Sequence, residues 1–257
     1  MAISDTARRT HDELFPGYVS ELAVTDPELV EYFDNFAFDE VLQHAGPLDT
    51  RTRLMVQLAA LIACHAVGEY RVMLGAALTV GVTPVEVKEI VYHAVPYVGM
   101  AKVFDILHAT NDVLTERDVA LPLEGQSTTT PDTRMERGLD VLREVIGADR
   151  VEQLYATAPS DEAHIPRFLT GNCFGDTFTR TGLDLRTREL LVLAMLASLG
   201  GCEPQLKGHV GNNRNVGNDR ATQLAVITQL LPFIGYPRTL NALRILDETL
   251  PAESNNP

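Results

Sequence analysis

The sequence is poor in cysteine, in basic residues and in long apolar runs, and each shortage argues against a class of protein. Three cysteines among 257 residues form no disulfide framework, so we expect a reducing, cytoplasmic environment. Lysine and arginine number 21 against 35 acidic residues, and the net charge of −14 predicts no nucleic-acid or anionic-membrane partner. The longest apolar run, residues 190–199, is much shorter than the roughly 20 residues that span a bilayer. The polar N-terminus also lacks the apolar stretch of a signal peptide.

What the sequence does contain is an internal repeat. The segment LDTRTR at residues 48–53 recurs as LDLRTR at 183–188, and PYVG at 96–99 recurs as PFIG at 232–235. The blocks recur in the same order at nearly constant spacing, which chance does not readily produce. We therefore predict a duplicated module.

The composition between the repeats indicates where one copy ends. Residues 121–133 are rich in proline, glycine, serine and threonine, which is typical of a linker. We predict a first module over residues 1–120, this linker, a second module over 134–250 and a short tail at 251–257.

Apolar spacing indicates helices in both copies. In residues 51–66 apolar side chains recur every three or four positions, and residues 186–199 are apolar nearly all round, as in a helix buried on several sides. Thr83-Pro84-Val85-Glu86 is a capping box that begins another helix. No alternating strand pattern occurs, so we predict an all-α fold of two tandem helical bundles.

Particular residues mark the expected helix boundaries. We expect Asn218 to cap the second copy's counterpart of the capping-box helix. Pro96 and Pro232 are expected to end these two helices. Residues 134–146 are amphipathic and stop at Gly147.

Residues that could carry chemistry gather in the second copy, where one core helix gives way to the next. His209 is the strongest candidate, because an imidazole gives or takes a proton near neutral pH. Gln205 lies four positions earlier on the same helical face and could fix the tautomer of His209 or hold a substrate oxygen. Lys207 and Arg188 could bind a carboxylate.

The first copy has diverged at these positions. Met73 and Glu69 stand where the second copy has its histidine and glutamine, so we do not expect two equal sites. Glu69 and the neighbouring Tyr70 are candidates for substrate binding, although such groups often face solvent or an interface. His65 and Glu69 supply two metal ligands without a third, so we predict no metal.

Each candidate also has a structural interpretation. His209 could be a partly buried structural histidine, and Arg188, repeated as Arg53, could tie helices together through ion pairs or caps. Cys202 follows two glycines near a helix N-terminus and could be reactive. It lacks a partner thiol, which favours a packed, inert side chain.

A set of short motifs recurs along both copies. The second copy contains FGD at 174–176, GLDLRTREL at 182–190, QLKGHV at 205–210 and GYPR at 235–238. The first copy keeps FAF at 36–38, LDTRTR at 48–53, GVTP at 81–84 and VG at 98–99. This combination resembles the carboxymuconolactone decarboxylase family, whose superfamily also holds the alkylhydroperoxidase D-like proteins. The resemblance covers about residues 29–114 and 164–250.

The resemblance implies a decarboxylation, or a related proton transfer, that uses no cofactor. Its substrate would be a small carboxylated lactone or keto acid. His209 would protonate the carbon that loses CO₂ or polarise the carbonyl that takes up its electrons. Gln205, Lys207 or Arg188 would orient the carboxylate.

The superfamily divides on one pair of cysteines. Its peroxidase-like members carry a CxxC pair, a glutamate on the preceding helix and a histidine four residues after the second cysteine. Glu189, Cys202 and His209 match three of these places, but Gln205 replaces the second cysteine. One thiol cannot form an intramolecular disulfide, so the resemblance favours the decarboxylase-like branch.

Two further functions stay open at this point. A one-cysteine thiol peroxidase would depend on Cys202, and a non-catalytic binding protein would have kept the fold without the chemistry. Family members assemble as rings, so the resemblance also implies a homo-oligomer, a trimer or a hexamer, with sites between copies.

Overall fold

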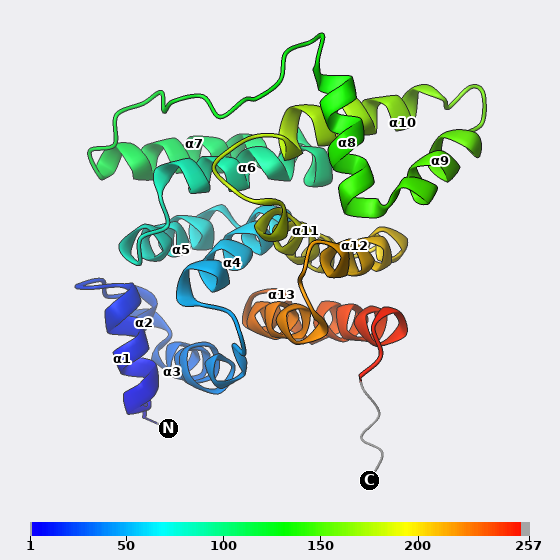
Figure 1. Ribbon diagram of the computed structural model, residues 1–257. Helices are drawn as coiled ribbons and strands as arrows, with labels where there is room; N and C mark the ends of the chain where they lie inside the picture. Colours follow the sequence, from blue (N-terminus) through cyan, green and yellow to red (C-terminus); the bar gives the residue numbers. More distant parts are fainter. Residues whose placement is uncertain (1, 253–257) are drawn as a thin grey trace.

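The computed structural model describes residues 2–252, and within that range every regular element is a helix (Figure 1). The all-α prediction is confirmed, whereas five residues of the predicted tail at 251–257 lie outside the described residues. The first module comprises α1 (Asp5–Leu14), α2 (Leu22–Thr25), α3 (Pro27–Asn35), the π-helical segment η1 (Phe36–Glu40), the short 3₁₀ turn η2 (Leu42–His44), α4 (Thr50–Cys64), α5 (Val67–Thr79), α6 (Pro84–Val98) and α7 (Met100–Glu116). The second comprises α8 (Arg134–Ile146), α9 (Ala148–Ala156), α10 (His164–Phe168), the π-helical segment η3 (Leu169–Phe178), α11 (Leu185–Leu199), α12 (Glu203–Asn215) and α13 (Arg220–Thr249).

The helices form three layers in which the modules interlock (Figure 1). The central layer holds α4, α5, α11 and α12, and the repeated helices α4 and α11 pack against each other. On one side, η3 of the second module contacts α6 of the first; on the other, η1 and η2 contact α13. Each module therefore covers the other.

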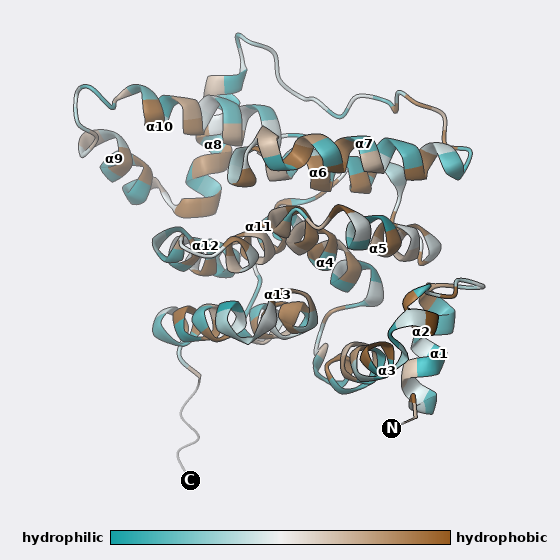
Figure 2. Ribbon diagram, turned by 180° about the vertical axis from the view of Figure 1, so that it is seen from behind, coloured by the Kyte–Doolittle hydropathy of each residue, from teal (hydrophilic) through white to brown (hydrophobic). Residues whose placement is uncertain are grey.

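Mutual burial explains why residues 186–199 are apolar nearly all round. Leu191, Val192 and Leu193 on consecutive faces of α11 are each completely buried, as are Leu54 and Leu58 on α4. Figure 2 shows apolar residues along α4, α6 and α11, where the layers meet. The cover that this apolar helix needs comes from within the same chain. No described helix is long and apolar enough to cross a membrane.

Aspartate caps explain the repeated LDxRTR motif. The Asp49 side chain accepts a hydrogen bond from the backbone N–H of Thr52 at 2.7 Å, and Asp184 accepts one from Thr187 at 2.7 Å. Each aspartate satisfies an N–H group that the first helical turn leaves free. The capping box at Thr83 is confirmed, with hydrogen bonds in both directions between Thr83 and Glu86.

Three expected boundaries are wrong. The N-cap of α13 is Asp219, not Asn218, because the Asp219 carboxylate accepts the N–H of Thr222 at 2.8 Å. Pro96 and Pro232 lie inside helices that continue past them. The breaks come at Gly99 and Gly235, whose φ angles of 82° and 75° suit a residue without a side chain.

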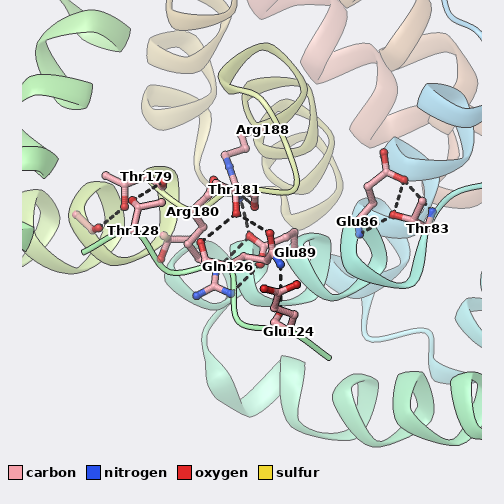
Figure 3. Close-up of polar contacts among 12 residues, drawn as sticks. Thr83, Glu86, Glu89, Glu124, Gln126, Thr128, Thr179, Arg180, Thr181 and Arg188 are labelled. Carbon is pink, nitrogen blue, oxygen red and sulfur yellow. Dashed lines mark hydrogen bonds and ion pairs between the residues drawn. The ribbon is translucent and has the colours of Figure 1, made fainter. Parts of the chain in front are cut away.

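The linker at 121–133 runs back along η3. Thr128 Oγ1 donates a hydrogen bond to the carbonyl of Thr179 at 2.8 Å, and the backbone N–H of Thr181 donates to the carbonyl of Gln126 at 3.0 Å (Figure 3). These contacts attach the linker to the second module after it leaves the first.

Candidate active site

A cavity of about 630 Å³ opens at the junction of the two modules, beside α12. The first module contributes Pro96 and Tyr97 from the end of α6. The second contributes side chains from five elements: Leu142, Ile146, Arg150, Gln153, Leu154, Leu169, Phe174, Leu196, Leu199, Cys202, Gln205, His209 and Asn212, among others. Its walls are largely apolar with a few polar groups, as in sites for small ligands.

Close packing of α8 against η3 sets one wall of this cavity. A Cβ atom added to Gly138 would lie 2.2 Å from the carbonyl oxygen of Thr170, and one added to Gly175 would lie 2.2 Å from that of Arg134. Only glycine allows the two backbones to come this close. The contact places Phe174, beside Gly175, at the cavity wall.

His209 in the cavity wall is paired with a glutamate behind it. His209 Nδ1 lies 2.8 Å from Glu189 Oε2, and the Glu189 side chain is completely buried, whereas 15% of the His209 side chain is exposed. An ionised carboxylate only accepts hydrogen bonds, so Nδ1 carries the proton of this contact and Nε2 is the nitrogen left for a ligand. Among the described residues, Glu189 Oε1 is buried without a hydrogen-bond partner.

Buried asparagines hold this pair in place. Asn213 Nδ2 donates hydrogen bonds to the backbone carbonyls of Glu189 and His209, each at 2.9 Å, and so ties α11 to α12. Its own Oδ1 accepts a hydrogen bond from Asn218 at 2.8 Å, and Asn218 also contacts Arg186. Asn218 therefore supports the site instead of capping α13.

Tyr97 approaches the pair from the other module. Its ring centroid lies 5.5 Å from that of His209 in an edge-to-face arrangement, and its hydroxyl accepts a weak hydrogen bond from Cys173 Sγ at 3.7 Å. Burial, reinforced by Cys173 and Glu189, raises the pKa of Tyr97 well above 10. The hydroxyl therefore keeps its proton, and with Cys173 as donor that proton can point to a ligand.

A second histidine lies behind Tyr97. The ring centroid of His93 is 5.6 Å from that of Tyr97 and 4.7 Å from that of Phe178. Burial, together with the positive charge of Arg188, lowers the pKa of His93 well below 6.5. His93 is thus a neutral, packed ring that supports Tyr97.

Cys202 and Gln205 line the same cavity. Cys202 Sγ donates a hydrogen bond to the carbonyl of Leu196 at 3.4 Å, and burial, with a smaller effect of Glu203, raises the pKa of the thiol. The reactive form of cysteine is the thiolate, so this environment disfavours a nucleophilic role. Gln205 is exposed at the cavity mouth.

Comparison with known proteins shows the family to which this fold belongs. A model of the carboxymuconolactone decarboxylase family matches residues 27–112 and again residues 163–248. The chain belongs to the carboxymuconolactone decarboxylase family. A 4-carboxymuconolactone decarboxylase from Acinetobacter baylyi (strain ATCC 33305 / BD413 / ADP1) is 32% identical over 117 residues, which cover 45% of this chain and 85% of that protein. Two family matches in one chain confirm the tandem arrangement, and both findings support a decarboxylase-like role at family level.

Four predicted substrate-binding residues of this family member lie outside the His209 cavity. Arg188 is completely buried in an ion pair with Glu89 at 2.8 Å (Figure 3). Lys207 is exposed and lies 3.8 Å from Glu248. In the first module, Glu69 is exposed and Tyr70 is buried with its hydroxyl 2.8 Å from Thr110 Oγ1.

The structure adds polar residues that the sequence reasoning missed. Arg150 on α9 and Asn212 on α12 line the cavity, and Arg150 forms no ion pair with any described residue. No motif surrounds Arg150, so nothing in the sequence singled it out. Tyr97 did leave a signal, because it is the tyrosine of PYVG where the other copy has Phe233.

Aromatic rings gather at the matching place in the first copy. Phe233 takes the place of Tyr97 in the PYVG repeat, and the Phe33 ring lies 6.0 Å from Phe233 and 6.1 Å from Phe38. Met73 stands in the sequence place of His209, so this copy lacks the histidine of the other site. Within residues 2–252, no group of three histidine, cysteine or acidic side chains converges to hold a metal.

Proposed function

We propose that the chain decarboxylates a small carboxylated lactone or keto acid, with His209 as the group that gives or takes the proton. The observation that carries this proposal is the His209–Glu189 pair, held by buried hydrogen bonds at the wall of a ligand-sized cavity. Membership of the carboxymuconolactone decarboxylase family supports the reaction class.

The proposed step needs an electron sink and one proton. Loss of CO₂ leaves an electron pair on carbon, which a conjugated lactone or ketone carbonyl takes up as an enolate. His209 then delivers a proton from Nε2 to that carbon, and water restores the proton to the imidazole. Glu189 holds Nδ1–H, which orients the ring and stabilises its charged form.

The polar rim of the cavity suits the substrate's carboxylate. Arg150 is exposed and forms no ion pair with any described residue, and Gln205 and Asn212 add amide groups. We assign the orienting role to Arg150, because Arg188 and Lys207 are engaged elsewhere. The apolar wall behind would favour loss of the charged carboxylate as neutral CO₂.

The thiol peroxidase alternative has less support. The Cys202 pKa is raised, and the residue three positions later is Gln205, so neither a thiolate nor a partner thiol is at hand. A non-catalytic binding protein would not need a buried carboxylate aligned on a cavity histidine.

Turnover of candidate substrates by matched variants tests the proposal. The panel begins with 4-carboxymuconolactone, the lactone named for the relative, and continues with other carboxylated lactones and keto acids. We expect CO₂ release by the wild type and a loss of about 10²-fold or more in kcat for His209→Gln. His108→Gln, which changes an exposed histidine on α7, is the control and should keep full activity.

Two results would contradict the proposal. A folded His209→Gln variant with wild-type turnover would remove His209 from the reaction. Peroxide consumption by the wild type that disappears in Cys202→Ser, with no CO₂ release from any substrate, would instead establish the thiol chemistry.

A further inference from the structure

A second cavity, of about 340 Å³, lies beneath the linker and shares no lining residue with the His209 cavity. We call it the linker cavity. Its floor is formed by Val85, Lys88, Glu89 and Tyr92 of α6 and by Asn111 of α7, and residues 121–126 of the linker cover it, with Arg180 at one end.

A buried ammonium group without an acidic partner lies in the linker cavity. Lys88 is 8% exposed, and its Nζ donates a hydrogen bond to Asn111 Oδ1, a neutral acceptor. No carboxylate of the described residues forms an ion pair with it. Burial lowers the pKa of Lys88, which is the response of a cation that lacks a counter-charge.

Two arginines near Lys88 bring further positive charge to this region. The carboxylate of Glu89 is 1% exposed and accepts hydrogen bonds from two arginines, from Arg180 at 2.8 to 3.1 Å and from Arg188 at 2.8 Å (Figure 3). Two guanidinium groups therefore share one carboxylate. In a chain with net charge −14, this corner of the fold is locally cationic. Glu124, the other acidic side chain of the cavity, is exposed at its rim.

Much of the remaining lining is apolar. Val85, Leu121 and Leu123 form the walls, and the ring of Tyr92 lies between the two cations, 5.2 Å from Arg180 Cζ and 6.0 Å from Lys88 Nζ. Such a cavity matches a small molecule with one negative charge and an apolar body.

We propose that the linker cavity is a binding site for a small organic carboxylate, separate from the His209 cavity. The carboxylate takes the place of the counter-ion that Lys88 lacks, with Arg180 beside it. The apolar body packs on Tyr92 and beneath Leu121 and Leu123. Desolvation of the buried ammonium is then balanced by an ion pair with hydrogen bonds.

Fluorine NMR of the full chain with 4-fluorobenzoate as the probe tests this site. The His209 cavity is first blocked with Gly208→Phe, because Gly208 lines that cavity and a Cβ added there meets open space. In this background we add Lys88→Met, or Leu123→Trp, which fills the linker cavity from a segment outside the helices. The control is Lys102→Met, which also removes a lysine whose Nζ is bound to a neutral oxygen, the carbonyl of Ala63.

We expect saturable probe binding to persist in Gly208→Phe and in Gly208→Phe with Lys102→Met. The affinity should fall at least tenfold in Gly208→Phe with Lys88→Met and with Leu123→Trp. The proposal is overturned if Gly208→Phe binds no probe, or if neither linker-cavity variant weakens binding. Because Leu123→Trp leaves Lys88 unchanged, it decides the question even if the lysine variant does not fold.

Discussion

Nδ1 of His209 lies 2.8 Å from Oε2 of Glu189, and the two residues belong to successive helices, α12 and α11, of the second module. The glutamate has no contact with solvent, so its carboxylate acts through the histidine and not on a ligand directly. This makes Glu189 a positioning residue for the proposed proton transfer.

Glu189→Gln should therefore lower activity without weakening substrate binding. The amide is close in shape to the carboxylate but cannot stabilise a charged imidazole, so we expect kcat to fall about 10²-fold with KM nearly unchanged. Wild-type kcat in a folded Glu189→Gln variant would contradict this role.

Tyr97→Phe converts the first copy's tyrosine to the residue that the second copy carries as Phe233. The hydroxyl has Cys173 as its hydrogen-bond partner, so the free energy of unfolding should change by less than about 1 kcal/mol. We expect kcat/KM to fall about tenfold because a donor to the ligand is lost. Tyr236→Phe, at an exposed tyrosine, is the control; equal kcat/KM in both variants would exclude the hydroxyl from the site.

The buried ion-pair cluster should dominate the stability of the contact between modules. Glu89→Gln leaves Arg188 and Arg180 without their shared carboxylate, and Arg188 is completely buried, so we expect a loss of about 3–5 kcal/mol in unfolding free energy. Urea denaturation measures it. Asp112→Asn, which breaks an exposed pair with Arg71, should cost less than about 1 kcal/mol. Similar losses of unfolding free energy in the two variants would contradict the dominant role of the Glu89 cluster.

The approach of α8 to η3 should depend on the absence of a side chain. In Gly138→Ala the new Cβ would lie 2.2 Å from a backbone carbonyl, so the helices must separate, and we expect a loss of about 3 kcal/mol or more. Gly68→Ala, in an open position of α5, should be neutral or should stabilise by about 0.5–1 kcal/mol. Thermal unfolding compares the two variants. An unchanged stability in Gly138→Ala would show that α8 and η3 can move apart at little cost.

His93 should make stability depend on pH below neutrality. Its folded-state pKa lies well below 6.5, because burial and the charge of Arg188 disfavour the protonated ring. Above pH 6.5 both folded and unfolded states are neutral at this residue. As pH falls below 6.5, the unfolded chain binds a proton that the folded chain does not, which costs about 1.4 kcal/mol per pH unit.

Replacing His93 by leucine should remove that dependence. Urea denaturation between pH 5 and pH 7 should show the wild type losing stability relative to His93→Leu as pH falls. If the unfolding free energies of the two proteins change equally with pH, His93 is protonated as readily in the folded state as in the unfolded state.

Much of the fold could be predicted from the sequence because its signals are local. Apolar spacing depends on neighbours three or four residues apart, and the capping box at Thr83 is contained in one turn. The helix end is predicted at Pro96 and not at Gly99, three residues later, because a proline within a helix is usually the stronger signal. The sequence alone cannot choose between Asn218 and Asp219 as the cap, because both side chains suit that role.

By itself, the sequence determined that the chain is a duplicated all-helical protein with its protonatable imidazole in the second copy, since duplication, helix periodicity and residue type are properties of the linear order. Tertiary structure alone decided that Arg188 pairs with Glu89, 99 positions away, and that Tyr97 of one module lies beside His209 of the other. The reason is physical: interlocking layers bring together side chains that no local spacing relates, and burial then determines which charges are paired and which are left for a ligand.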